Sequence, residues 1–288
     1  MPRPHAPAVL LAALLGAGCA THAEQLRDIR TAYHAGDTAG AGAKLDAALA
    51  GAGRDADVLK LDRATVLLSE GKPREAEALF REVRDHFDAK EGRDLAEGAL
   101  ALLADDQKLA YSGEDYEKVL VRLMLALSDL FAGGSDAGAF ALQVNQKQQE
   151  IIDKSKSVDG DGKNLKERFK LVPAGAYLHA ALREETQTNY DDAARSLELV
   201  TKWQPDFAPA RADLERVRTG RHSQPGHGVV YVFALVGRGP YKEERAEVAT
   251  TVSLLVADRI LSAAGRQALP PTIAPVKVPR VVRPATTS

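Results

Sequence analysis

The sequence predicts a mainly α protein, an array of helical hairpins stacked into a solenoid, with a small α/β extension near the C-terminal end. Three observations support this fold class. Alanine and leucine dominate a chain of 288 residues with only 5% aromatics, which suits helices packed closely through small side chains. Residues 32–50 and 67–85 align with each other through a shared pattern of glycine, alanine and apolar positions. After residue 225, glycine-bounded runs of β-branched and aromatic residues replace the helical pattern.

Each of the two matching stretches describes one helical hairpin. Its first helix ends at a glycine, which accepts the left-handed turn that closes many helices. A small alanine five positions later lets the two helices approach closely. A large apolar residue follows four positions further on, and another apolar residue three positions beyond that. The matching residues are Gly36 and Gly71, Ala41 and Ala76, Leu45 and Phe80, and Ala48 and Val83, at an offset of 76 − 41 = 35. This pattern resembles the tetratricopeptide repeat, a pair of antiparallel helices of about 34 residues.

Two further units fit the pattern less closely. Residues 125–151 place Gly134, Ala139 and Ala141 in suitable positions, but glutamine and asparagine follow at the later core positions. Residues 177–207 fit better. Their matching residues are Tyr190, Ala193, Leu197, Val200 and Pro205. The alternative interpretation is a generic bundle of alanine-rich hairpins.

The start of the chain has the features of an export signal. Arg3 supplies positive charge, "AVLLAALL" (8–15) is a short apolar run, and "GAG" precedes Cys19, the only cysteine. The run is too short to cross a bilayer as a helix. This order resembles the lipobox of bacterial lipoproteins, in which the cysteine becomes a lipidated N-terminus, although Gly16 stands where leucine is commonest. The alternative is a buried thiol in an ordinary signal peptide.

The lipobox resemblance sets the expected domain order. Residues 1–18 are the lipoprotein signal peptide and 19–28 a lipidated tether. Tetratricopeptide-like helical repeats follow over 29–218, with an insertion at about 153–170. The resemblance implies an exported protein, lipid-anchored to a bacterial membrane, with the outer membrane favoured because alanine and not aspartate follows the cysteine. Each buried methylene contributes about 0.8 kcal/mol, so an anchor of several acyl chains is effectively permanent.

The segment "YSGEDYEKVL" (111–120) is the least generic part of the repeat region. Two tyrosines bracket an acidic turn, and acids at the start of the helix that follows interact favourably with its dipole. Tyrosines are also favoured at protein interfaces. The candidate partner-binding residues are therefore Tyr111, Glu114, Asp115, Tyr116 and Glu117. The alternative is a helix start whose tyrosines pack on the hairpin beneath.

With the lipobox and the repeats, this segment resembles a family of bacterial lipoproteins with tetratricopeptide repeats. The Tyr-x-Gly-x-x-Tyr-Glu segment, the stretch 173–193 and "GHGVVYVFALVGRGPYKEE" (226–244) occur in the family's order, the last ending in Gly-x-x-Pro-x-Lys-x-Glu. The resemblance implies membrane anchoring, and no activity is assigned to the family. Its members are generally longer, so we expect a short or truncated member.

The pattern after residue 225 predicts a strand–turn–helix extension over 226–265. The run "GVVYVFALV" (228–236) is typical of a strand, 237–240 of a turn, and the following residues to 265 of a helix from Lys242. The tail, 266–288, is basic and rich in proline. Because it lies at the end of the chain, such a tail is expected to be disordered. The alternatives are that it lies on an anionic lipid surface or pairs with the edge of a sheet.

No motif indicates catalysis, a cofactor or a metal. The loop "VDGDGKN" (158–164) resembles a calcium loop but has Lys163 at a ligand position. His222 and His227 lie in a polar loop without a third ligand, and a lone His179 on a predicted helix is expected to be a surface or packing residue and not a base. The acidic pair Glu184–Glu185 is typical of a solvated helix face.

The expected function follows from these features. A net charge of −2 gives no bias toward nucleic acid. The sequence predicts a protein-binding adaptor or scaffold and not an enzyme. Its partner would be another envelope protein, and its role would be in envelope assembly or secretion. The alternative is a structural subunit of a larger envelope complex, in which the strand at 228–236 completes a neighbour's sheet. An envelope enzyme is the least favoured interpretation.

Overall fold

A computed structural model describes most of the repeat region and parts of the C-terminal region. The described residues are 22–53, 56–97, 113–155, 163–168, 171–220, 222–235, 241–247 and 276–282. Cys19 and Tyr111 lie outside them. The chain forms two compact units, Met1–Val229 and Val230–Ser288, which are described separately.

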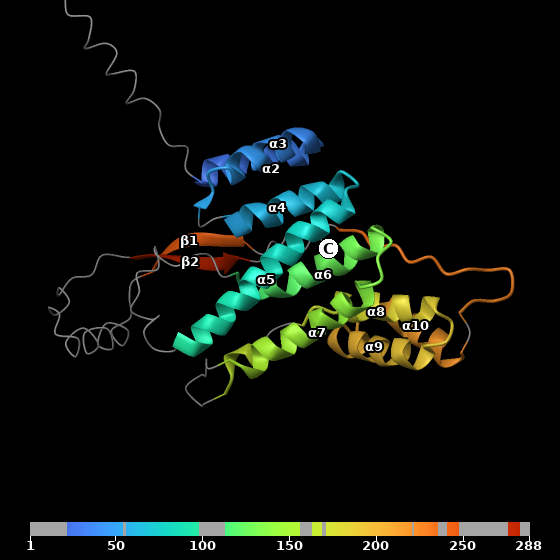
Figure 1. Cartoon of the computed structure of the whole chain (residues 1–288). Helices are drawn as coiled ribbons and strands as arrows, with labels where there is room; N and C mark the ends of the chain where they lie inside the picture. The colour runs from blue at the N-terminus through green and yellow to red at the C-terminus, as the bar shows by residue number, and fades with distance from the viewer. Residues whose placement is uncertain are drawn as a thin grey trace, which may run out of the picture. The chain divides into compact units, whose positions relative to one another are not determined.

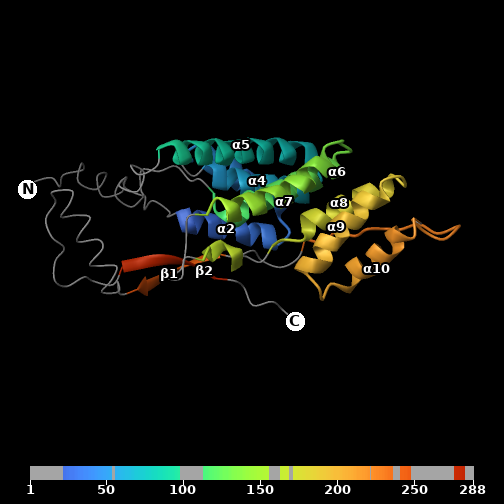
Figure 2. The same ribbon diagram turned by 90° about the horizontal axis from the view of Figure 1, so that it is seen from below.

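The first unit is mainly helical, as expected. Its helices are α2 (His22–His34), α3 (Thr38–Leu49), α4 (Ala56–Ser69), α5 (Pro73–Glu97), α6 (Asp115–Phe131), α7 (Ala137–Asp153), the short 3₁₀ helix η4 (Leu165–Arg168), α8 (Ala174–Glu185), α9 (Tyr190–Trp203) and α10 (Ala208–Arg218). Each α-helix packs mainly against the helices before and after it in the chain (Figures 1 and 2). This packing is consistent with a helical solenoid. No helix among the described residues is long and apolar enough to cross a membrane.

The turns of the first two hairpins confirm the predicted helix ends. Gly36 and Gly71 adopt left-handed φ angles of +83° and +72°. The residue after each glycine donates its backbone N–H to a carbonyl five positions back, from Asp37 to Ala32 at 3.0 Å and from Lys72 to Leu67 at 2.9 Å. These bonds close the first helix of each hairpin and turn the chain into the second.

The predicted small residues lie at the centre of three hairpins. Ala41, Ala76 and Ala193 are each the fourth residue of α3, α5 and α9, and all three are fully buried. The larger residues predicted to follow them are buried too. They are Leu45, Phe80, Leu197, Val83 and Val200. Burial of this set stabilises the first unit chiefly through the hydrophobic effect.

The third hairpin departs from the predicted register. Of the two alanines predicted at small core positions, Ala139 is exposed and Ala141 is fully buried, and the fourth residue of α7 is the buried Phe140. The left-handed residue of this turn is Gly133, not Gly134. The turn to α7 is also longer, because the buried Asp129 carboxylate accepts N–H groups from Asp136 at 2.8 Å and Ala137 at 2.7 Å. This contact delays the start of α7 and shifts its core face.

The second unit contains a two-stranded antiparallel sheet among its described residues. Strand β1 (Tyr241–Glu247) pairs with β2 (Val276–Val282), in a register from Tyr241 opposite Val282 to Glu247 opposite Val276. The prediction of a helix from Lys242 is therefore wrong for β1. Glutamate, lysine and arginine favour helices locally, but pairing with a distant segment overrides that preference. That partner strand lies within the basic tail, so the expectation of a disordered end is wrong for Val276–Val282, which pair with β1.

The predicted strand at 228–236 is also not observed. Residues 228–235 form no strand in the structure, because no described segment pairs with them and a strand is defined by its ladder of hydrogen bonds. Residues 248–275 lie outside the described part of the chain, so the rest of the predicted helix is not placed.

Candidate functional site

The described candidate residues form the first turn of α6. Glu114 is the N-cap, and its backbone N–H donates to the Glu117 carboxylate at 2.8 Å. The Glu114 side chain in turn accepts from the backbone N–H of Glu117, which completes a capping box. The two acids therefore satisfy two of the N–H groups that lack backbone partners at the helix start.

The other two described candidates also have neighbours within the chain. Asp115 forms an ion pair with Lys166 of η4 at 2.7 Å. Tyr116 is partly buried, and burial together with the negative charges of Glu117 and Glu114 raises the pKa of its phenol to about 12. The phenol thus keeps its proton and can donate a hydrogen bond at any physiological pH.

The glycine of this segment is held by packing. Gly113 has a left-handed φ of +77°, and a Cβ atom at this position would lie 2.6 Å from the ring of Phe87, which is fully buried on α5. The start of α6 is thus fixed against α5 by a contact that only glycine permits. These geometries give the segment a structural role, as the alternative interpretation expects. Binding of a partner by these residues stays a prediction.

Replacing this glycine tests the structural role. We expect Gly113→Ala to lower the free energy of unfolding by about 2 kcal/mol, from left-handed strain of about 1–2 kcal/mol and crowding against Phe87. Chemical denaturation followed by circular dichroism measures the loss. The control is Gly133→Ala, with a φ of +70° and nothing within 4 Å of the added Cβ, where strain alone is expected. Equal losses at both positions would contradict the packing contact.

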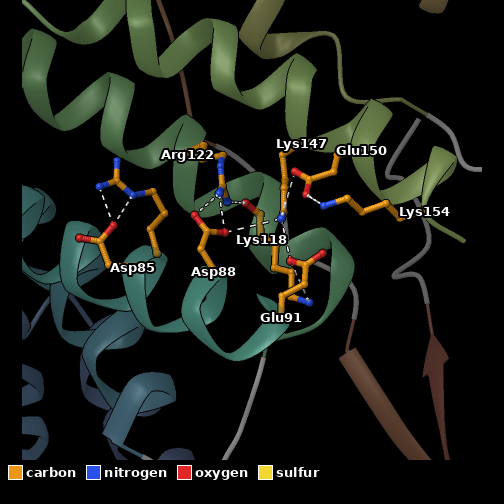
Figure 3. Close-up of polar contacts among 9 residues, drawn as sticks. Asp85, Asp88, Glu91, Lys118, Arg122, Lys147, Glu150 and Lys154 are labelled. Atoms are coloured by element: carbon orange, nitrogen blue, oxygen red, sulfur yellow. Dashed lines mark hydrogen bonds and ion pairs between the residues drawn. The ribbon is translucent and has the colours of Figure 1, made fainter. Parts of the chain in front are cut away.

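A charged cluster joins α5, α6 and α7 next to this helix start (Figure 3). We define it as Asp88 and Glu91 of α5, Lys118 and Arg122 of α6, and Lys147 and Glu150 of α7. Arg122 donates to both carboxylate oxygens of Asp88, at 2.7 and 2.6 Å. Lys147 donates to Glu91 at 2.7 Å and lies 3.5 Å from Asp88 and 3.4 Å from Glu150.

The two central cations of the cluster are more buried than their acids. The side chains of Lys147 and Arg122 are 4% and 7% exposed, whereas that of Asp88 is 41% exposed. Lys147 lies seven residues after Phe140, the position that Val83 and Val200 occupy in α5 and α9. A cation thus replaces an apolar core residue, and long polar side chains join the second hairpin to the third.

A second polar cluster joins α8, α10 and the loop after α10. Glu184 is fully buried and accepts two hydrogen bonds from Arg216, at 2.7 and 2.8 Å. Arg216 also donates to Asp213 at 2.6 Å, and Tyr177 donates to the same carboxylate at 2.5 Å. His222 lies 3.2 Å from Glu184. The predicted solvated face is wrong for Glu184.

A buried histidine and serine lie close together between α8 and α9. His179 Nδ1 is 2.8 Å from Ser196 Oγ, and Arg183 Nε donates to His179 Nε2 at 3.1 Å. Because a guanidinium only donates, Nε2 is the acceptor and the ring proton is on Nδ1. The imidazole therefore donates to the serine hydroxyl instead of removing its proton. This arrangement does not activate Ser196 as a nucleophile, and it gives His179 the packing role expected of it.

The environment of His179 predicts a pH effect on stability. Burial, followed by the charge of Arg183, lowers the pKa of His179 below its ordinary 6.5, while Asp192 acts weakly in the opposite sense. As the pH falls below about 6.5, the unfolded chain takes up a proton that the folded chain does not, so stability falls. We expect His179→Asn to remove this part of the pH dependence. Unfolding measured at about pH 7.5 and about pH 5.5 tests this, and parallel profiles for the two proteins would contradict it.

Sequence reasoning missed one surface feature of the first unit. A hollow of about 340 Å³ lies between the α4–α5 turn and the end of α6, and its lining includes Lys72, Arg74 and Phe131. Phe131 is 57% exposed, more than any other large apolar side chain described in this unit. Its position at the end of the apolar pattern of α6 was the only signal in the sequence.

The described side chains bring no group of three metal-ligating residues together. Comparison of the chain with protein families, curated proteins and solved structures found no match.

Proposed function

We propose that this chain is a membrane-anchored lipoprotein that binds another envelope protein through a tetratricopeptide-like helical array. It acts as an adaptor or scaffold in envelope assembly or secretion and makes or breaks no bond. Cys19 carries the lipid, and the array supplies the binding surface.

The recurring alanine contact carries this proposal. Ala41, Ala76 and Ala193 hold the same place in three second helices, where each is fully buried. This recurrence resembles the tetratricopeptide repeat, in which a small residue lets the paired helices approach closely. Arrays of such hairpins present extended surfaces on which segments of other proteins bind.

Two places on the first unit are candidate contact surfaces. One is the start of α6, where Tyr116 keeps a protonated phenol. The other is the hollow, where an exposed Phe131 lies near Arg74 and Lys72. Aromatic and arginine side chains contribute most to binding at protein interfaces. The lining also includes Glu75, and Lys72 already pairs with Glu70 at 2.8 Å. The hollow therefore suits a partner segment with an apolar side chain against Phe131 and a carboxylate that meets Arg74.

Affinity capture of the intact protein from detergent-solubilised membranes tests the binding surface. We expect a defined envelope protein to bind the wild type and to be lost with Arg74→Ala/Phe131→Ala or with Tyr111→Ala/Tyr116→Ala. Leu142→Ala, which removes a partly exposed side chain from α7, is the matched control and should retain the partner. If the wild type and all three variants captured the same partner equally, the proposed surfaces would be wrong. Circular dichroism of each variant shows whether it keeps the fold.

Lipid attachment needs a separate experiment. We expect the wild type to incorporate a labelled fatty acid and to sediment with membranes. Cys19→Ser should lose the label and be released. A variant that still carries the label would show that Cys19 is not the acceptor.

A further inference from the structure

The segment 230–235 exposes an unusual amount of apolar surface. Val230, Val232 and Leu235 are 85%, 84% and 64% exposed, the three highest values among the described large apolar side chains. Tyr231 and Phe233 are partly buried. Their rings stack 6.5 Å apart with an interplanar angle of 21°. Side chains two residues apart lie on the same side of an extended backbone, so this stacking indicates that the segment is extended although it is not paired as a strand.

One backbone edge of this segment is open. In an extended chain, the N–H and C=O groups of alternate residues point to the same side. Within the part of the chain that the structure describes, Val230, Val232 and Ala234 form no backbone hydrogen bonds along that side. Neither Lys, Arg, Asp nor Glu occurs between residues 222 and 237. The edge therefore lacks the charges that natural proteins place on exposed edges to prevent pairing.

The residues along this edge are self-complementary. We propose that it pairs antiparallel with the same edge of a second copy of the chain, about a two-fold axis at Val232. In that register Val230 lies opposite Ala234 and Tyr231 opposite Phe233. Each hydrogen-bonded pair exchanges two N–H···O=C bonds, and the aromatic pairs meet on one face. A two-fold interface requires such a self-matching surface, and the absence of charge means that no like charges oppose each other.

A charge reversal at Val232 tests both the partner and the register. In every sample the full-length chain carries Cys19→Ser, so that lipid cannot hold molecules together. We expect the reference protein to form a dimer with rising concentration in sedimentation velocity. Val232→Lys and Val232→Glu should each weaken the dimer about tenfold or more, because each places like charges opposite one another. An equimolar mixture of the two variants should restore it, since lysine then faces glutamate.

The control places the same charge off the axis. Leu235→Lys faces Val229 in the proposed register, so the dimer should persist. Equal weakening by Leu235→Lys and Val232→Lys would indicate non-specific apolar association and overturn the register. A reference protein that stays monomeric would overturn the proposal and assign the edge to a strand of another protein or to lipid. A mixture that fails to restore the dimer would also overturn it. None of these outcomes depends on the proposed partner of the first unit.

Discussion

Glu184→Gln is expected to lower the free energy of unfolding by about 3–5 kcal/mol, the loss typical when one member of a buried ion pair is removed. Glu184 is fully buried, and both its carboxylate oxygens accept from Arg216. Glutamine keeps the shape but presents an N–H₂ group to a guanidinium that only donates. Arg216 then retains Asp213 alone among these contacts. Denaturant unfolding followed by circular dichroism measures the loss.

A solvent-exposed pair in the same region provides the control. Glu198 and Arg218 lie 2.6 Å apart, with side chains 51% and 58% exposed. Glu198→Gln removes the same chemistry from water-exposed surroundings, where ion pairs contribute about 0–1 kcal/mol. If both substitutions have the same small effect, then the Glu184–Arg216 pair does not hold α8 to α10.

The structure shows which parts of the fold the sequence can predict. The roles of Gly36, Ala41 and their counterparts in the second hairpin can be predicted from the sequence. The turn, the close contact between the helices and the buried face all depend on residues within one hairpin. The sequence pattern predicts the wrong register for the third hairpin because Asp129, on the preceding helix, caps α7. The pattern of β1 predicts a helix because the strand that pairs with it lies far along the chain. Local patterns carry no information on contacts of that range.

The same distinction applies to the candidate sites. The acidic start of α6 can be predicted because a helix start has a local sequence signature. In the structure, however, its acids cap the helix or form an ion pair with Lys166. Glu184 next to Glu185 has the pattern of a solvated face, and Arg216 lies 32 residues further on. Lys147 falls at a core position only once the true start of α7 is known. Buried charge is therefore the feature that single-sequence reasoning misses here.

The double variant Asp88→Asn/Glu91→Gln is expected to lower the free energy of unfolding by about 3 kcal/mol or more. It removes the two α5 carboxylates from Arg122 and Lys147, which are both buried and lie side by side in the charged cluster (Figure 3). Among the acids that the structure describes around Lys147, Glu150 at 3.4 Å then remains. A buried cation without compensation is strongly unfavourable. Denaturant unfolding of the variant and the wild type gives the difference.

A third substitution separates charge from shape in the same cluster. Adding Lys147→Met removes one uncompensated cation but keeps an unbranched side chain at a core position, so the triple variant should be more stable than the double variant. Asp85→Asn on the same helix, where Asp85 is 64% exposed and pairs with Arg84, should cost less than about 1 kcal/mol. A triple variant no more stable than the double one would mean that buried charge is not the cause of the loss. The second and third hairpins would then be held together by packing, in which the guanidinium groups of Arg81 and Arg84 lie over the ring of Phe140.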